Sequence, residues 1–434
     1  MSMTMRNKAL DTTSRMNQRF VLEAVTASPP LRRQRADRRP NRFGGIGGNT
    51  RWRGSPCPRM SQTRHPRKEF SLLLAAPTGP AAMLIRIQSG NRIDGAQATC
   101  DSQVDTEVVG RDEGGMKQAR PFRFGVFGES SRTRETLLDT ARRAEDSGYA
   151  TFLIRDHFIA EPFGHQLAPL SVLATVAGAT KTLRVGSLVF SNDYRHPLIL
   201  AKEIATLDVL SNGRVELGLG AGFSQAEYDS AGIRFDSPGV RVARLEEAIH
   251  LLKGLFSGVP LTFTGKHYSV THFEGFPTPV QRPHPLLLIG AAGKRMLSIA
   301  AREADIIGFQ TVSTANGVVL DDPDIRLASA VAQKIELVRR MAGDRFDRIE
   351  LSLVATVVIA EQRRQAAEQF SRDRGWRGIS AEQVLEMPSI FIGSAEHIAE
   401  EMQARRERYG FSYFVLLDHA MEKAAPIVAR LAGR

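Results

Sequence analysis

Cysteine is almost absent from this chain of 434 residues. Its two cysteines, Cys57 and Cys100, both lie within the first hundred residues. The remaining residues therefore hold no thiol for a disulfide, a zinc cluster or a catalytic nucleophile. This cysteine content is compatible with the reducing cytoplasm, where we expect the protein to be.

Long hydrophobic runs are also lacking. The best candidate, FSLLLAAPTGPAAMLI from Phe70, is interrupted by Pro77, Gly79 and Pro80. A membrane span needs roughly 18 to 20 consecutive apolar residues, which no stretch reaches. A secretory signal would place its apolar region within about the first 30 residues, and here about seventy residues come first. The sequence therefore predicts neither a membrane span nor a secretory signal.

The positive charge of the chain is confined to one end. The whole chain has 58 Lys and Arg against 47 Asp and Glu, and the first hundred residues hold 18 of the basic groups and 5 of the acidic ones. The other residues carry 40 basic and 42 acidic groups. The main part of the chain therefore gives no electrostatic reason to expect nucleic acid or a membrane surface as its partner.

Residues 1–118 have the composition of a low-complexity basic extension. Arg, Pro and Gly are mixed there without an apolar period of 2 or 3.6. Such a segment buries too little apolar area to offset the entropy of ordering, so we expect disorder, or a start assigned too far upstream of Met116. The alternative is an arm that binds the phosphates of nucleic acid.

Residues 119–434 alternate between apolar runs and segments of helical period. Runs typical of buried strands begin at residues 122, 151, 183, 215, 286, 305, 351 and 413. Helices are expected between them, for example over 133–148, where Thr133 can cap the first turn and Gly148 can end the helix. Eight parallel βαβ units predict an α/β domain with the (β/α)8 TIM-barrel fold, and an open doubly wound sheet is the alternative.

One connection, residues 254–285 between the fourth and fifth strands, is longer than the others. Its segment LTFTGKHYSVTHF alternates around a Thr-Gly-Lys turn, which predicts a β-hairpin. In a barrel enzyme such an insertion is typical of a lid or substrate wall across the mouth of the barrel. A structural or dimer-contact role is the alternative.

Polar and small residues follow several predicted strands, at the end where barrel enzymes have their active sites. Asp156 and His157 follow the second strand, and a histidine can exchange a proton near neutral pH. After the fourth strand, GLGAGF has glycines at 218, 220 and 222, which let the backbone approach a flat ligand.

The third strand ends in the polar run SNDYRHP. Pro197, with its fixed φ, is expected to start the next helix. Arg195 and His196 either contact ligands at the mouth or hold the loop in place.

The segment IGAAGKRML runs from the fifth strand directly into a predicted helix. The free N–H groups at the helix start favour a phosphate, and Lys294 and Arg295 add positive charge. An ordinary tight turn is the alternative, and the spacing does not match a Walker loop. The histidines lack the spacing of metal ligands and no GxSxG elbow is present, so neither a metal site nor a serine triad is predicted.

RDHF, SNDYRHP, GLGAGF and IGAAGKRML, in this order and each after a predicted strand, resemble the motifs of the luciferase-like flavin and deazaflavin oxidoreductases. The resemblance covers residues 120–434 and implies a (β/α)8 barrel that transfers a hydride between a bound cofactor and a small organic substrate. The Asp-His pair is more similar to the coenzyme F420-dependent branch, so F420 is the expected cofactor. The alternatives are an FMN-dependent monooxygenase and a non-catalytic ligand-binding barrel.

The resemblance also implies which residues bind the cofactor and which transfer protons. The cofactor-binding positions are Asp156, Ser187, Leu188, Asn192, Gly220, Ala221, Gly222, Ala291, Ala292, Gly293 and Lys294. In several relatives a non-proline cis peptide bond follows the third strand, and the matching pair here is Ser187-Leu188. Proton transfer is assigned to His157 or Glu161.

Two positions depart from the sugar-phosphate dehydrogenases of the F420 branch. Phe223 stands where those enzymes have an acidic residue, and Glu161 stands where they have a tryptophan. A sugar phosphate is therefore not the expected substrate. The resemblance leaves a homodimer open.

Overall fold

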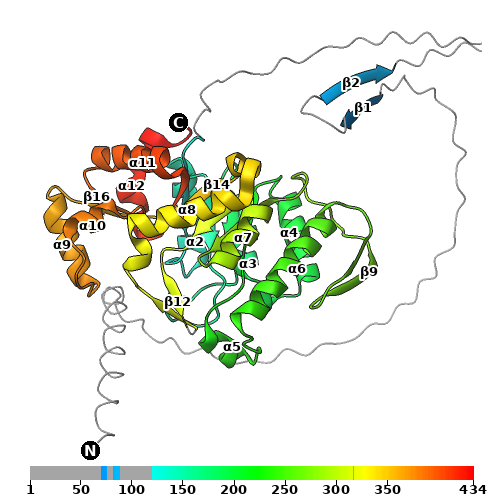
Figure 1. The fold of residues 1–434 in the computed structure, drawn as a ribbon, viewed down its shortest axis with the longest axis horizontal. Helices are drawn as coiled ribbons and strands as arrows, with labels where there is room; N and C mark the ends of the chain where they lie inside the picture. Colours follow the sequence, from blue (N-terminus) through cyan, green and yellow to red (C-terminus); the bar gives the residue numbers. More distant parts are fainter. Residues whose placement is uncertain (1–69, 76–81, 88–119, 316) are drawn as a thin grey trace, which may run out of the picture. The chain divides into compact units, whose positions relative to one another are not determined.

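The structure is a computed structural model that describes residues 70–75, 82–87, 120–315 and 317–434 (Figure 1). The chain divides into two units, residues 1–112 and 113–434, which are described separately. In the first unit β1 (Phe70–Ala75) pairs antiparallel with β2 (Ala82–Ile87), and no strand was predicted there. The other predictions for residues 1–118 lie outside the described residues.

Eight parallel strands of the second unit form a closed barrel. They are β3 (Arg123–Phe127), β4 (Thr151–Ile154), β5 (Arg184–Ser187), β7 (Val215–Gly220), β10 (Leu286–Ala291), β11 (Ile306–Phe309), β14 (Glu350–Val354) and β17 (Phe411–Leu417). Strand β10 pairs with both β11 and β7, which closes the sheet. The predicted TIM barrel is confirmed, and the open sheet is wrong.

Two predicted strands divide where the chain leaves the barrel. After β14, the N–H of Ala355 donates to Val415 of the barrel, whereas the N–H of Thr356 donates to Ser389 outside it. The chain continues as β15 (Thr356–Ile359), which pairs with β16 (Ile390–Gly393) in a separate two-stranded sheet. Similarly, β6 (Phe190–Ser191) follows β5 after a break and pairs with β7.

Helices surround the strands. Most of them cover the outside of the barrel, whereas the two helices between β15 and β16 pack against that separate sheet. In the part of the chain that the structure describes they are α2 (Arg134–Asp146), α3 (Pro169–Ala179), α4 (Pro197–Leu210), α5 (Gln225–Ala231), α6 (Pro238–Phe256), α7 (Lys294–Glu303), α8 (Ala328–Ala342), α9 (Arg363–Asp373), α10 (Ala381–Glu386), α11 (Ala395–Tyr409) and α12 (Met421–Leu431). As predicted, Thr133 caps α2, and Gly148 follows its end with a φ of 82°. Pro197 is the first residue of α4, also as predicted.

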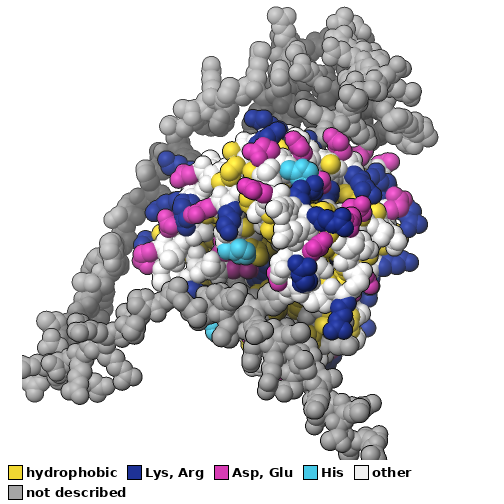
Figure 2. Space-filling model, turned by 90° about the vertical axis from the view of Figure 1, so that its left-hand side faces the viewer, with side chains coloured by type: hydrophobic (Ala, Val, Ile, Leu, Met, Phe, Trp, Pro, Cys, Tyr) yellow, Lys and Arg dark blue, Asp and Glu magenta, His cyan; other side chains and the backbone are white. Residues whose placement is uncertain are grey.

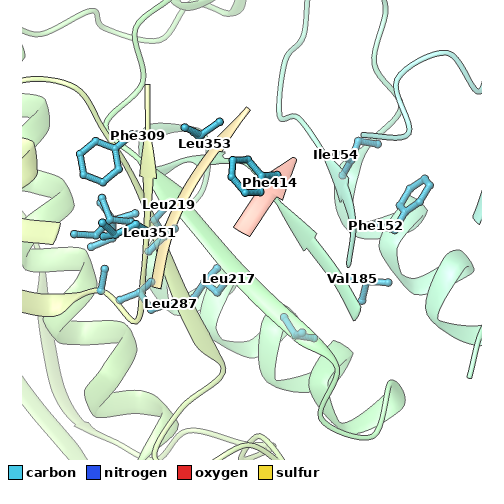
Figure 3. Close-up of a cluster of buried hydrophobic side chains, with 14 of the residues drawn as sticks. Phe152, Ile154, Val185, Leu217, Leu219, Leu287, Phe309, Leu351, Leu353 and Phe414 are labelled. Carbon is cyan, nitrogen blue, oxygen red and sulfur yellow. The ribbon is translucent and has the colours of Figure 1, made fainter. Parts of the chain in front are cut away.

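Alternate residues of each strand pack into two different cores. Phe152, Leu217, Leu287 and Phe414 belong to the layer between the barrel and its helices (Figure 3). The residues between them in sequence face the barrel interior, where a second apolar cluster contains Phe127, Leu153, Leu288, Ile306, Tyr413 and Val415. Because successive side chains of a strand point to opposite faces, a continuous apolar run gives each strand two buried faces.

The amino end of the barrel interior is filled by a polar layer. Glu216, whose side chain is 1% exposed, forms ion pairs with Arg123 and Arg184. Thr151 and Tyr413 each donate a hydrogen bond to it, at 3.1 Å. This layer closes the end of the barrel opposite the predicted active site.

The predicted hairpin is present, but it does not cross the mouth of the barrel. Strands β8 (Leu261–Thr264) and β9 (Ser269–Phe273) pair antiparallel, and Glu247 of α6 accepts N–H donors at 2.8 Å from Lys266 and His267 in the turn. No residue of β8 or β9 lines the central cavity. A shorter pair, β12 (Ser313–Ala315) and β13 (Val318–Leu320), contributes to the cavity wall instead.

The described surface carries charges of both signs. On the face shown in Figure 2, acidic and basic side chains are interspersed, which agrees with the balanced charge expected after residue 100. Within the described residues, no helix combines the length and the apolar character needed to cross a membrane.

Candidate active site

A cavity of about 940 Å³ opens at the carboxyl ends of the barrel strands. All eight strands contribute to its wall at or near their ends. The contributing residues are Phe127, Asp156, Leu188, Gly220, Gly290, Phe309, Val354 and Leu417. This is the position at which barrel enzymes bind their substrates.

The floor of the cavity is a loop that folds inward after β5. Leu188 and Val189 line the cavity, and the peptide bond between them is cis. The predicted position of this bond, Ser187-Leu188, is one residue too early. The N–H of Leu188 still donates to Ile154 of β4 at 3.1 Å, so the ladder extends one residue further before the chain departs.

Glycines on the neighbouring strands leave room for this loop. A Cβ on Gly218 would lie 1.8 Å from the carbonyl oxygen of Ser187, and a Cβ on Gly220 would lie 2.6 Å from Val189. On β10, a Cβ on Gly290 would lie 3.3 Å from the same valine. The result is an apolar floor beside a wall of bare backbone.

His157 lines the cavity and is held by a buried carboxylate. Its Nδ1 lies 2.8 Å from Oε2 of Glu227, a residue of α5 that is fully buried. The same carboxylate accepts the N–H of Phe158 and, at 3.0 Å, the hydroxyl of Tyr194. Burial tends to raise the pKa of Glu227, but the hydrogen bonds from His157 and its neighbours outweigh it and hold this pKa below the usual value.

Asp156 also lines the cavity, and its charge is neutralised within the protein. Arg195 donates to both of its carboxylate oxygens, at 2.6 and 3.1 Å, and the N–H of Ser191 donates to one of them at 3.1 Å. His196 caps α4 by accepting the N–H of Leu198. Since neither Arg195 nor His196 lines the cavity, both hold the loop in place.

The structure brings most predicted site residues to the cavity, but not all of them. Asp156, His157, Leu188, Gly220, Ala221, Gly222, Ala292 and Gly293 line it. Ser187, Asn192 and Ala291 are buried behind the wall, where Ser187 donates to Gly218 at 3.1 Å and Asn192 donates to Tyr268 at 3.2 Å. Glu161 and Lys294 are exposed and do not line the cavity, so the structure does not place either at the site.

Several charged residues of the cavity were not predicted. Glu227 lies in the first turn of α5, four residues after Phe223, so the acidic residue in GFSQAEY was the available signal. Arg155, paired with Glu129 and stacked between two phenylalanines, directly precedes the predicted Asp156. Arg241, Arg326 and Arg374 come from segments that gave no signal in the sequence.

Comparisons with known proteins agree with this architecture. The family described as luciferase-like monooxygenase matches residues 119–411. A curated relative, the F420-dependent glucose-6-phosphate dehydrogenase of Amycolatopsis mediterranei, is 31% identical over 220 residues, which are 50% of this chain and 64% of that protein. The protein of the same name from Nakamurella multipartita is 30% identical over 254 residues, 57% of this chain and 71% of that protein. The chain thus spans between 64% and 71% of the length of these two relatives.

A solved structure shows the same fold. It is the coenzyme F420 dependent tetrahydromethanopterin reductase from Methanopyrus kandleri, with a TM-score of 0.56 and 19% identity. The similarity covers 72% of this chain and 99% of that one.

Proposed function

Because the chain belongs to the luciferase-like monooxygenase family, we propose that it is an oxidoreductase that transfers a hydride between coenzyme F420 and a small organic substrate. The observation that carries this proposal is His157, which faces the cavity while the buried Glu227 holds one of its ring nitrogens. The names of the two curated relatives support F420 as the cofactor.

The lining of the cavity supports the binding of a flat tricyclic ring with a phosphate-bearing side chain. Leu188 and Val189 offer an apolar floor, and the backbone of Gly220 and Gly222 borders it without side chains. Gly293 is the N-cap of α7 and provides no side-chain cap, so the first N–H groups of this helix remain available for a phosphate. Leu188, Val189, Gly220 and Gly222 would hold the ring, and Ala292 and Gly293 would hold the phosphate.

When bound, the deazaflavin would supply or accept the hydride. The protein must then move a proton to or from the substrate, and His157 is placed to do so. The Nδ1–H group of His157 donates to Glu227, which leaves Nε2 with a free lone pair. Nε2 is therefore the ring nitrogen that can exchange a proton with a molecule in the cavity. Glu227 therefore fixes the tautomer and the orientation of the ring.

Two aromatic rings lie beside His157. The rings of Phe163 and Phe223 lie 5.0 and 5.7 Å from the imidazole, and both line the cavity. An apolar surround strengthens the interaction of His157 with a developing charge on the substrate.

Cofactor binding and turnover test this proposal separately. We expect the fluorescence of oxidised F420 to change when the protein is added, and His157→Asn to bind F420 as the wild type does. Turnover of any substrate should fall by roughly 10²- to 10⁴-fold in this variant. The proposal fails if F420 at roughly 50 µM does not bind while FMN binds tightly.

A further inference from the structure

Two arginines from distant parts of the sequence meet in the cavity wall. Arg326 ends the short 3-10 helix η2 (Asp324–Arg326), which follows the β12–β13 pair, and Arg374 follows the last residue of α9. Both line the cavity. The Arg326 side chain is 8% exposed and therefore buried, whereas that of Arg374 is 27% exposed and only partly buried.

A single carboxylate serves both arginines. Asp321 Oδ1 accepts from Nη2 of Arg326 at 2.7 Å, and Oδ2 accepts from Nη1 of Arg374 at 2.6 Å. The indole of Trp376 donates to the Asp321 carbonyl at 3.1 Å and holds this aspartate in place. Within this cluster of three side chains, two guanidinium charges face one carboxylate, which is a net charge of +1.

The two arginines keep donors that these bonds do not use. Among the described residues, the hydrogen bonds engage Nε and Nη2 of Arg326 and Nη1 of Arg374. Nη1 of Arg326 and Nη2 of Arg374 are thus available to a ligand. Burial lowers the pKa of Arg326, the neighbouring charge of Arg374 lowers it further, and the charge of Asp321 opposes both.

Two other arginines near the cavity floor are each paired with one carboxylate. Arg155 pairs with Glu129, and Arg195 pairs with Asp156. Arg241 has a backbone carbonyl of Asp236 as its partner, but it lies at the start of α6. Arg295, in the first turn of α7, donates to Gly239, in the first turn of α6, at 2.9 Å. The starts of the two helices are therefore neighbours, and Arg241 lies near the start of α7, which would hold the cofactor phosphate.

From this charge balance we infer that the substrate is a monoanionic carboxylate with an apolar body, whose carboxylate binds Arg326 and Arg374. A single carboxylate matches the net charge of +1, and two guanidinium groups offer it the paired donors that planar oxygens accept. Side chains of Phe163, Phe223, Val312 and Val319 line the rest of the cavity and suit an apolar chain. The inference rests on the proposed function only in naming this ligand a substrate.

Hexanoate and its uncharged analogue hexanamide are suitable probes, measured by calorimetric titration of the full chain without cofactor. We expect hexanoate to bind at least about tenfold more tightly than hexanamide, and Arg374→Gln to reduce this ratio to below about twofold. The control Arg364→Gln, at the opposite end of α9 and 73% exposed, should keep the ratio. Asp321→Asn should raise the ratio, because it removes the competing carboxylate.

Each other outcome overturns the inference. If the two probes bound equally, or if Arg374→Gln left the ratio unchanged, the ion pairs of Asp321 with Arg326 and Arg374 would have only a structural role. Inorganic phosphate that displaces hexanoate at equal concentration would replace the carboxylate by a phosphate. If Arg374→Gln weakened F420 binding about tenfold, the two arginines would belong to the cofactor site and not to a substrate site. A failure of F420 to bind the wild type would instead refute the proposed function and leave the hexanoate result unaffected.

Discussion

Replacing Glu216 by glutamine should destabilise the barrel without changing its shape. This carboxylate is 1% exposed and pairs with Arg123 and Arg184, the latter at 2.9 Å. The amide of glutamine is nearly isosteric but carries no charge, so two partly buried guanidinium groups would lose their shared partner. Removing one member of a buried ion pair typically costs about 3 to 5 kcal/mol. Since Arg123 keeps its second partner, Glu350, at 2.7 Å, we expect a loss of about 3 kcal/mol.

Urea unfolding followed by circular dichroism measures this loss. The matched control is Glu368→Gln, which removes i,i+4 pairs with Arg364 and Arg372 from the surface of α9, where the glutamate is 44% exposed. The control should change the free energy of unfolding by less than about 0.5 kcal/mol. If Glu216→Gln also changed this free energy by less than about 1 kcal/mol, the ion pairs of Glu216 would not stabilise the barrel.

The same variant has a pH signature. Burial raises the pKa of Glu216, but the charges of Arg123 and Arg184 outweigh this effect and lower it below the usual value of 4.5. A group whose pKa is lowered by folding stabilises the protein above its ordinary pKa, and this contribution is lost as the pH falls. The difference between wild type and Glu216→Gln should therefore be constant near neutrality and shrink below about pH 4.5.

Three further predictions concern the floor, a loop and the histidine. Gly218→Ala should cost about 2 kcal/mol or more, because its Cβ would lie 1.8 Å from a backbone oxygen. Gly178→Ala, with nothing within 4 Å, should cost nothing in the same urea assay. Glu145→Gln should cost about 1 to 2 kcal/mol, because Oε1 of Glu145 accepts three N–H groups and a hydroxyl from residues 181–183. Burial raises the pKa of Glu145, but these bonds outweigh it and lower it to about 2, so this cost should vanish between pH 4.5 and pH 2. Glu227→Gln should preserve F420 affinity but slow turnover by roughly 10²-fold, and an unchanged rate would remove Glu227 from the mechanism.

The barrel strands could be predicted because each one carries its own pattern. Apolar side chains occupy both faces of β4 and β10, and a run of this kind needs no knowledge of distant residues. The points at which strands end were harder to predict. The apolar run through Ala355 continues without a break, and only the partners of its N–H groups show that the chain changes sheets there.

The place of the β8–β9 hairpin could not be predicted from its own sequence. The turn chemistry around Gly265 is local and was interpreted correctly. Its position depends on Glu247, a residue of α6 whose carboxylate accepts three successive N–H groups of the turn. Such a tertiary contact leaves no period or motif in the sequence.

The candidate site could likewise be predicted only where the signal is local in the sequence. Asp156 and His157 could be found because they directly follow a strand, and the barrel brings strand ends together. Arg374 could not, because it reaches the cavity through an ion pair with Asp321, 53 positions earlier in the chain. Lys294 was chosen for its charge beside a helix start, yet its side chain is exposed.

The side chains of the cavity floor come from one short segment, the inward loop at Leu188 and Val189. In a barrel filled evenly by all eight strands, reshaping the floor would require coordinated changes on several of them. Here β7, β10 and β11 contribute glycines at that level, and a single loop supplies the side chains. Substitutions at these two positions could thus alter which ligands fit while the remaining strands keep their packing. Related sequences could therefore acquire new substrates by changing only the few residues of this loop.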